Sequence, residues 1–229
     1  MANSWIPIKR SPVHSKLEKM GAVLENISQW QCVERFSDPN QEIKMVKAGV
    51  GLLDLSFAGK WELKGKDLEE FLKSNLDQPS PNPGTAILTG SDCLIRITQN
   101  HALLITQQED NSSLLKLITT KFKSSCFHPI DRSSGLGQFL LCGPQARTVL
   151  SKLTSLDLRE DHFANLCCAC VPMAAIPTTI VHRNLNTLPS YQIVFNSESG
   201  EYLWDCIMEA GEEFDIGPFG LTALQLLER

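Results

Sequence analysis

Two stretches of the chain repeat one pattern of apolar and polar positions. Residues 61–77 and residues 139–157 each pass from a mostly apolar segment through a glycine into apolar positions spaced three and four residues apart. The first part is typical of a strand, and the second part of a helix with one buried face. The matched positions, at a constant offset of 78, are Leu63, Gly65, Leu68, Phe71 and Leu72 in the first stretch and Leu141, Gly143, Ala146, Val149 and Leu150 in the second.

The repetition resumes downstream. Residues 102–106 and 114–118 parallel residues 192–196 and 203–207, and the β-rich segments 93–98 and 178–183 precede them. Each copy therefore predicts the order βαββα, and the chain predicts an α+β fold of two pseudo-repeated halves around a central cleft, because interfaces between such halves favour ligand sites. The alternative is that a common strand-turn-helix pattern recurs by chance.

The copies divide the chain into three parts. Residues 1–50 form a lead-in segment packed on the core, residues 51–125 the first α+β repeat, and residues 126–229 the second. The lead-in contains a predicted helix at residues 41–49 that ends at Gly49. The proline-rich stretch 77–84 is a predicted loop inside the first copy, and Gly135, Leu136 and Gly137 predict a hairpin turn.

Composition restricts the partners. The formal net charge of -5 provides no general attraction to phosphate backbones, so nucleic acid is not an expected partner. No segment approaches the roughly 20 apolar residues of a membrane span, and the N-terminus has no signal-peptide core, so we expect no membrane partner and a cytoplasmic location.

Three closely spaced cysteines, Cys167, Cys168 and Cys170, are a candidate metal site. In a strand, neighbouring side chains point to opposite faces, so only Cys168 and Cys170 could share an ion. We therefore predict no metal and a core-packing role for these thiols, with redox sensing or metal binding as the alternatives.

Two aspartates precede or occupy apolar strands. Asp92 stands at the entry to the strand of residues 93–98, where it could face the cleft and orient an amine, although an ordinary turn aspartate is the alternative. Asp54 is expected to accept hydrogen bonds from nearby backbone donors. Walker and GxSxG motifs are absent from the sequence, which leaves no simple hydrolase or NTPase signature.

Four stretches, in chain order, resemble the folate-binding aminomethyltransferase family, which includes the T-protein of the glycine cleavage system and the gamma subunit of heterotetrameric sarcosine oxidase. They are SPVHSKLEKMGAVLE, VKAGVGLLDLSFAGKWELKGKDLEEFL, LLCGPQARTVLSKL and YLWDCIMEAGEEFDIGPFGLTAL. The resemblance implies two related halves around a folate cleft, tetrahydrofolate as cofactor, and an aminomethyltransferase of one-carbon metabolism. It also implies that Asp92 matches the catalytic aspartate of the family.

The sequence departs from the family at several site positions. HRNLNTLPSYQI replaces the glycine-rich stretch that carries the folate-binding glutamate, Leu224 and Gln225 replace an arginine-aspartate pair, and Ala58 replaces a pocket methionine. We also expect the protein to lack the C-terminal barrel domain of the T-protein. These departures predict a degraded active site; the alternative is a non-catalytic subunit or docking module whose partner is a larger protein. A catalytic Asp92 would face the cleft, whereas in a scaffold it would bind donors in its own turn, and the departures favour the scaffold.

Overall fold

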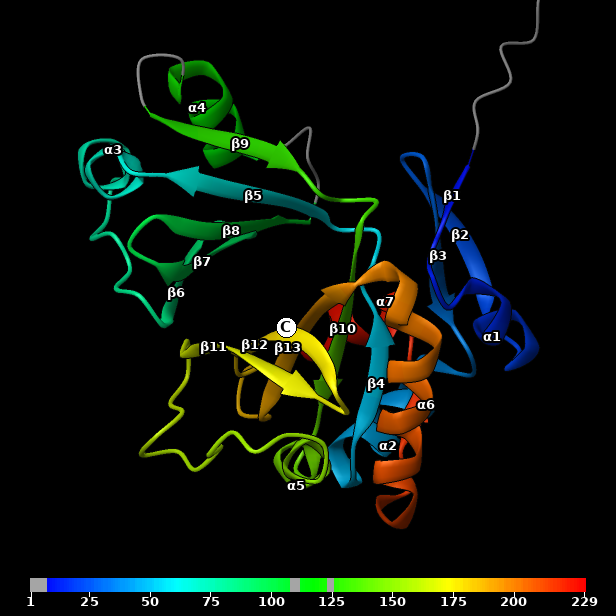
Figure 1. Ribbon diagram of the computed structural model, residues 1–229. Helices are drawn as coiled ribbons and strands as arrows, with labels where there is room; N and C mark the ends of the chain where they lie inside the picture. Colours follow the sequence, from blue (N-terminus) through cyan, green and yellow to red (C-terminus); the bar gives the residue numbers. More distant parts are fainter. Residues whose placement is uncertain (1–7, 108–111, 123–125) are drawn as a thin grey trace, which may run out of the picture.

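The described residues, 8–107, 112–122 and 126–229 of this computed structural model, form three β-sheets and the helices packed on them (Figure 1). The first sheet is small, with strand order β1-β3-β2. The elements of this lead-in part are β1 (Lys9–Arg10), α1 (His14–Lys19), β2 (Val23–Ile27), β3 (Trp30–Arg35) and α2 (Pro39–Ala48).

Helix α2 confirms the helix predicted at residues 41–49. Asp38 lies before it, and its carboxylate accepts a hydrogen bond from Asn40 N at 2.9 Å. Such an N-cap followed by a proline favours the start of a helix. The helix ends at Ala48, and Gly49 follows as the C-cap residue.

The first half of the chain forms a five-stranded sheet, with order β6-β7-β8-β5-β9. Its outer face is covered by two helices, and the core between sheet and helices includes Leu63, Leu72 and Leu94. The elements are β5 (Gly59–Gly65), α3 (Leu68–Asn75), β6 (Thr85–Thr89), β7 (Asp92–Thr98), β8 (His101–Thr106), α4 (Ser113–Lys121) and β9 (Phe127–Asp131).

The second half forms a six-stranded sheet, with order β11-β12-β13-β10-β4-β14. The elements are β4 (Gly51–Asp54), β10 (Leu136–Cys142), α5 (Ala146–Ser151), β11 (Cys168–Met173), β12 (Ile176–His182), β13 (Ser190–Asn196), α6 (Gly200–Gly211), β14 (Gly217–Pro218) and α7 (Leu221–Leu227). Two 3₁₀ turns, Ser197–Ser199 and Glu212–Phe214, flank α6.

The internal duplication is present in the structure. Both halves have the order strand, helix, three strands, helix, from β5 to α4 and from β10 to α6. Each copy thus has one strand more than the predicted βαββα, namely β6 and β11. Strand β6 follows the proline-rich loop, and β11 contains Pro172, which weakens the strand signal of the sequence.

The two sheets exchange one strand. Strand β4 precedes the first copy but pairs with β10, and β9 precedes the second copy but pairs with β5. The division of the chain at residues 50 and 125 therefore differs from the division into sheets. The exchange makes each half incomplete without a strand from the other's part of the chain.

Gly65 and Gly143 allow this exchange. They occupy equivalent positions, Gly65 at the end of β5 and Gly143 directly after β10, and have φ angles of +154° and +133°. A Cβ atom at Gly65 would lie 2.1 Å from Cys126 O, and one at Gly143 would lie 2.5 Å from Gly49 O. Glycine is required at both positions because the exchanged strand begins against its backbone.

The segments that carry the chain from one sheet to the other are also repeated. Asp54 Oδ1 accepts a hydrogen bond from Ser56 N at 3.0 Å, as predicted for a local backbone contact, and Asp131 Oδ1 accepts one from Ser133 N at 2.8 Å. The hairpin predicted at residues 135–137 is wrong, because β9 and β10 lie in different sheets. The turn signal of the glycines was correct, but pairing with distant strands decided where the chain goes.

The inner faces of the two larger sheets pack against each other. Side chains of both sheets form this core, among them Ile95 and Ile105 from the first half and Val181 and Val194 from the second. At one side the edge strands meet, because Ala86 N donates to Leu166 O at 2.8 Å. No helix in the described part of the chain is long and apolar enough to cross a membrane.

Candidate functional site

A cleft opens between the two larger sheets. The space inside it is about 740 Å³ when the open solvent at its mouth is counted. Strands of both halves line it, and α7 covers one side. We call it the central cleft; its lining includes Phe57, Cys93, Ile105, Gln138, Arg183, Gln192, Leu221 and Leu224.

Two glutamines lie at the base of the central cleft. Gln138 of β10 and Gln192 of β13 are 1% and 4% exposed, and their Oε1 atoms are buried without a hydrogen-bond partner. Gln138 lies opposite Val194, two residues from Gln192, so the glutamines are diagonal neighbours on one face of the sheet. An unpaired buried amide costs about 1–3 kcal/mol. A pair of them in a cleft indicates a place for a ligand that supplies the missing partners.

Asp92 lies on the other side of its strand from the central cleft. Its side chain is 2% exposed, and Ser112 Oγ donates a hydrogen bond to its Oδ2 at 2.6 Å. Ser112 is the N-cap of α4 and also accepts a hydrogen bond from Leu115 N. Asp92 therefore contacts the start of a helix, and its partner is in neither the cleft nor its own turn.

Cys93 is the residue of this strand that faces the cleft. Because strand neighbours point to opposite faces, Asp92 and Cys93 cannot both reach it. Burial raises the pKa of the Cys93 thiol to about 11, against the smaller opposing effect of Arg183. The thiol is therefore neutral at pH 7, and β7 presents no carboxylate to the cleft.

Arg183 follows β12 and is partly buried in the lining of the central cleft. Its backbone N donates to Ser190 O at 2.9 Å. Its guanidinium group has no hydrogen bond or ion pair with any residue of the described ranges. It shares the lining of the cleft with Cys93 of the first half.

Three positions at which the sequence departs from the aminomethyltransferases line this same cleft. Ala58, Leu224 and Gln225 all belong to its wall. The departures are thus concentrated around the cleft, and they leave its wall less polar and less charged than an arginine-aspartate pair would make it.

The duplication produces a second groove at the opposite end of the inter-sheet core. It has an empty volume of about 620 Å³. Strand register relates its residues to those of the cleft, because β7 and β8 correspond to β12 and β13. The pair Cys93–Ile105 corresponds to the pair Thr179–Val194. The pair Ile95–Leu103 corresponds to the pair Val181–Gln192. We call it the second groove; its lining includes Ile97, Leu103, Thr179, Val194 and Asn196.

The second groove shows which side chains the fold accepts at positions equivalent to those of the central cleft. The counterpart of Gln192 is Leu103. Arg183 follows Val181 by two residues, as Ile97, at a β-bulge of β7, follows Ile95, so Ile97 is the counterpart of Arg183 by position along the chain. The fold therefore accepts apolar side chains at both positions. Polar groups at these positions of the central cleft are better explained by a ligand than by the architecture.

The clustered cysteines separate in the structure. Cys168 is buried between the sheets, Cys167 is partly buried and Cys170 is exposed. Cys168 Sγ lies 3.5 Å from Arg96 O, and Cys170 Sγ lies 3.3 Å from Thr179 Oγ1. Within the ranges that the structure describes, no group of three or more metal-ligating side chains comes together.

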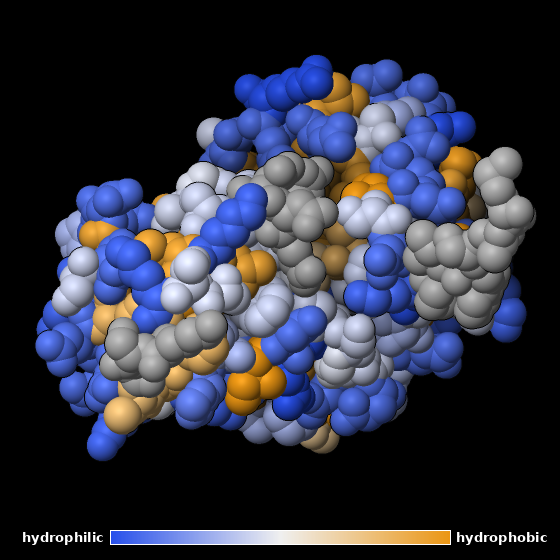
Figure 2. All heavy atoms as spheres, turned by 90° about the horizontal axis from the view of Figure 1, so that it is seen from above, coloured by the Kyte–Doolittle hydropathy of each residue, from blue (hydrophilic) through white to orange (hydrophobic). Residues whose placement is uncertain are grey.

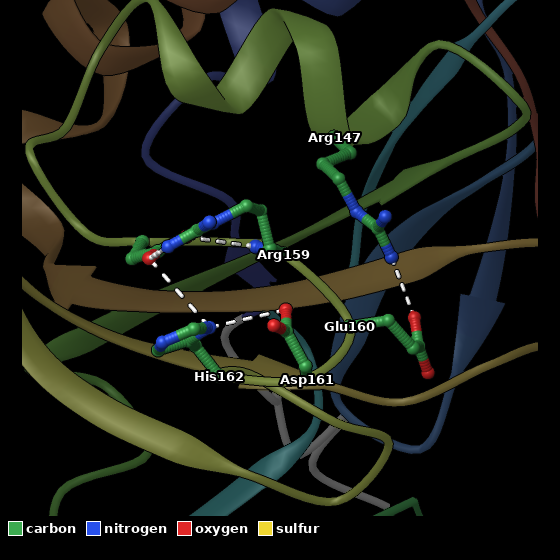
Figure 3. Close-up of polar contacts among 6 residues, drawn as sticks. Arg147, Arg159, Glu160, Asp161 and His162 are labelled. Carbon is green, nitrogen blue, oxygen red and sulfur yellow. Dashed lines mark hydrogen bonds and ion pairs between the residues drawn. The ribbon is translucent and has the colours of Figure 1, made fainter.

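A polar cluster formed by α5 and the segment that follows it is a surface feature (Figure 3). Arg147 pairs with Glu160 at 2.6 Å, and His162 pairs with Asp161 at 3.0 Å. All four lie partly or fully in solvent, where ion pairs contribute little. Figure 2 shows hydrophilic residues over most of one face, with hydrophobic ones between them.

Sequence reasoning missed Gln138, Gln192 and Cys93 as cleft residues. Both glutamines interrupt strands that are otherwise apolar, in GQFLLC and YQIVFN. A polar residue inside a buried strand is a usable signal, because such a position needs a partner. The side of the sheet on which each lies is not visible in the sequence.

Comparison with known proteins supports the resemblance. A family model described as the GCVT N-terminal domain matches residues 13–228. An aminomethyltransferase of Desulfitobacterium hafniense is 26% identical over 232 residues, which cover 96% of this chain and 63% of the relative. The chain thus spans less than two thirds of the length of this relative.

Solved structures agree on the fold. The aminomethyltransferase T of the glycine cleavage system from Bartonella henselae has a TM-score of 0.79 at 18% identity, covering 96% of this chain and 62% of its own. A chain of heterotetrameric sarcosine oxidase from Corynebacterium sp. U-96 has a TM-score of 0.68 at 18% identity, covering 91% of this chain and 97% of its own. With nearly its whole length matched, this chain belongs to the family of GCVT N-terminal domains.

Proposed function

We propose that the central cleft binds tetrahydrofolate or a closely related pterin of one-carbon metabolism. The observation that carries this proposal is the pair of buried, unpartnered amide oxygens of Gln138 and Gln192. A pterin ring presents an amino group and a ring N–H beside a carbonyl oxygen. Each glutamine amide can offer an acceptor and donors to such an edge, so the residues present fit the ring.

The walls of the cleft suit the rest of a flat heterocycle. Phe57 and Leu221 contribute apolar surface, and the glutamines would fix the orientation of the ring by hydrogen bonding. When bound, tetrahydrofolate would supply a carrier for a one-carbon unit. The residues of this chain bind and orient that carrier and keep it out of bulk water.

The transfer chemistry of the aminomethyltransferases is reduced in this proposal. The resemblance assigns a carboxylate to the strand equivalent to β7, whereas here the cleft-facing residue is the neutral Cys93 and Asp92 contacts α4. Glu228 is the sole carboxylate among the described lining residues, and it is exposed. A chain that binds folate without activating an amine agrees with this arrangement.

Titration calorimetry with tetrahydrofolate under anaerobic, reducing conditions tests the proposal. The wild type should bind, and Gln192→Leu should weaken binding about 10-fold or more, because donors of the ring lose their acceptor. Gln41→Leu, on the exposed side of α2, is the matched control and should bind like the wild type. Absence of saturable binding by the wild type up to millimolar concentration would overturn it.

A second candidate is a non-catalytic subunit of a larger complex. The match to almost the whole length of a chain from a heterotetramer favours it. It predicts that the native protein migrates in a stoichiometric complex heavier than its own 25.5 kDa. Light scattering on protein purified from its native source at low salt checks this, and a monomer of the calculated mass would count against it.

A further inference from the structure

The positive charge of Arg183 in the central cleft has no counter-ion among the described residues. Arg183 lines the cleft without an ion pair, and Asp92 lies on the opposite face of its strand, in contact with α4. Glu228 also lines the cleft but forms no ion pair with Arg183. A partly buried guanidinium group without a counter-ion favours an anion, because it can donate two parallel hydrogen bonds to a carboxylate.

The arginine is not needed to build this part of the fold. Its counterpart in the first half, Ile97, lines the second groove with an apolar side chain. An arginine that replaced it only to fill space would be expected to find a partner in the protein, as Arg96 does with Glu69. Arg183 instead remains without one at the same cleft as the unpaired glutamines.

Arg183 and Gln192 are placed to contact one ligand together. Arg183 lies opposite Ser190 of β13. Gln192 lies two residues after Ser190 in β13, on the same face of the sheet. Such diagonal neighbours have Cα atoms about 7–8 Å apart. This spacing suits a ring edge held by the amide and a charged substituent held by the guanidinium group.

We propose that, among the pterins of the proposed function, Arg183 makes the central cleft prefer one that carries a carboxylate close to its ring over tetrahydrofolate, whose carboxylates lie at the far end of its side chain. The inference rests on the proposed function, since Gln138 and Gln192 hold the ring and Arg183 holds the carboxylate. With Arg183 as its charged residue, the cleft suits an anionic ligand. A carboxylate at the position of Cys93 would instead suit a cationic amine. Arg183 is a specificity-determining residue that contacts the ligand.

Two fluorescent probes test this inference: pterin, which has the ring alone, and 6-carboxypterin, which adds one carboxylate. The wild type should bind 6-carboxypterin about 10-fold or more tightly than pterin, since a charged hydrogen-bonded pair is stronger than a neutral one. Arg183→Gln should bring this ratio close to one, because it weakens 6-carboxypterin far more than pterin. Arg183→Lys keeps the charge and should retain part of the ratio.

The outcomes separate the two proposals. Gln192→Leu should weaken the binding of both probes by the same factor. In the wild type, the ratio of the affinities for 6-carboxypterin and pterin should fall as sodium chloride is raised from 50 to 500 mM. Salt screens the charge, with a Debye length near 10 Å at about 100 mM. Binding of pterin with a ratio near one would overturn the role of Arg183 and leave the pterin site intact. Equal losses of both probes in a folded Arg183→Gln variant would also overturn it. Failure of both probes to bind the wild type would overturn the pterin site and the inference together.

Discussion

The central cleft and the second groove are built from equivalent strands, but their side chains differ in kind. Gln192 and Arg183 of the cleft correspond to Leu103 and Ile97 of the groove. The counterpart of Gln138 is Lys60, whose ammonium group is turned back onto the chain and donates to Ser56 O at 2.9 Å. The duplicated backbone therefore supplies two hollows, and the side chains prepare one of them for a polar ligand.

The largest expected effect comes from the glycines that both halves share. Gly65→Ala or Gly143→Ala should each destabilise the protein by about 3–5 kcal/mol, since a strained φ adds to overpacking against backbone. Urea unfolding of the two variants measures it. Gly90→Ala, with φ +61° and no atom within 4 Å of its Cβ, should cost about 1–2 kcal/mol. Tolerance of alanine at one of the two equivalent glycines would break the equivalence of the halves.

Exchanging the residues that distinguish the two hollows should have opposite effects on stability. Leu103→Gln buries an unpaired amide in the second groove and should cost about 2–3 kcal/mol. Gln192→Leu removes such an amide from the central cleft and should stabilise the protein by up to about 1–2 kcal/mol while weakening ligand binding. The free energies of unfolding in urea check both. Destabilisation by Gln192→Leu would mean that the fold requires the amide.

Asp92→Asn should have a smaller effect on stability, and the effect should depend on pH. Burial raises the pKa of Asp92 in the folded protein, although the hydrogen bond from Ser112 opposes this. A raised folded pKa means that the wild type loses stability as the pH rises from about 4 through that pKa. Asparagine keeps an acceptor for Ser112 and has no proton to lose, so the variant should gain stability relative to the wild type between pH 4 and pH 7.

Urea unfolding at the two pH values measures this difference. Asp77→Asn, on the exposed surface, is the matched control for the loss of one carboxylate. Affinity for tetrahydrofolate should be unchanged in Asp92→Asn, because the residue does not line the central cleft. A loss of binding or turnover in this variant would show that Asp92 takes part in the function of the central cleft.

The smallest effect on stability is expected in a segment that differs between the halves but lines neither the central cleft nor the second groove. Residues 152–167 of the second half are longer than their counterpart, residues 76–84, and carry the surface ion pairs of Figure 3. Glu160→Gln breaks the pair with Arg147 and should change the free energy of unfolding by less than about 0.5 kcal/mol. Denaturant midpoints within error of the wild type are expected; a shift above 1 kcal/mol would show that this segment supports the fold.

Local patterns were sufficient to predict much of the fold. The repeat, the end of α2 at Gly49 and the backbone contact of Asp54 all follow from signals within a few residues. Strands β6 and β11 were missed because β6 directly follows the proline-rich loop and β11 contains Pro172. The strand exchange was also missed, because the pairing of β4 with β10 joins residues far apart in the sequence.

The sequence by itself determined the family, the duplicated order of elements and the positions where site residues have been replaced. Tertiary structure alone decided which side of β7 meets the cleft. Its two faces, one bearing Leu94 and the other Ile95, are both buried, one by helices and one by the second sheet, so no polar alternation marks either. Packing of β7 between the helices and the second sheet placed Cys93 in the cleft and turned Asp92 toward α4. Pairing of β10 with the distant strand β13 brought Gln138 and Gln192 together, and local spacing cannot specify such a contact.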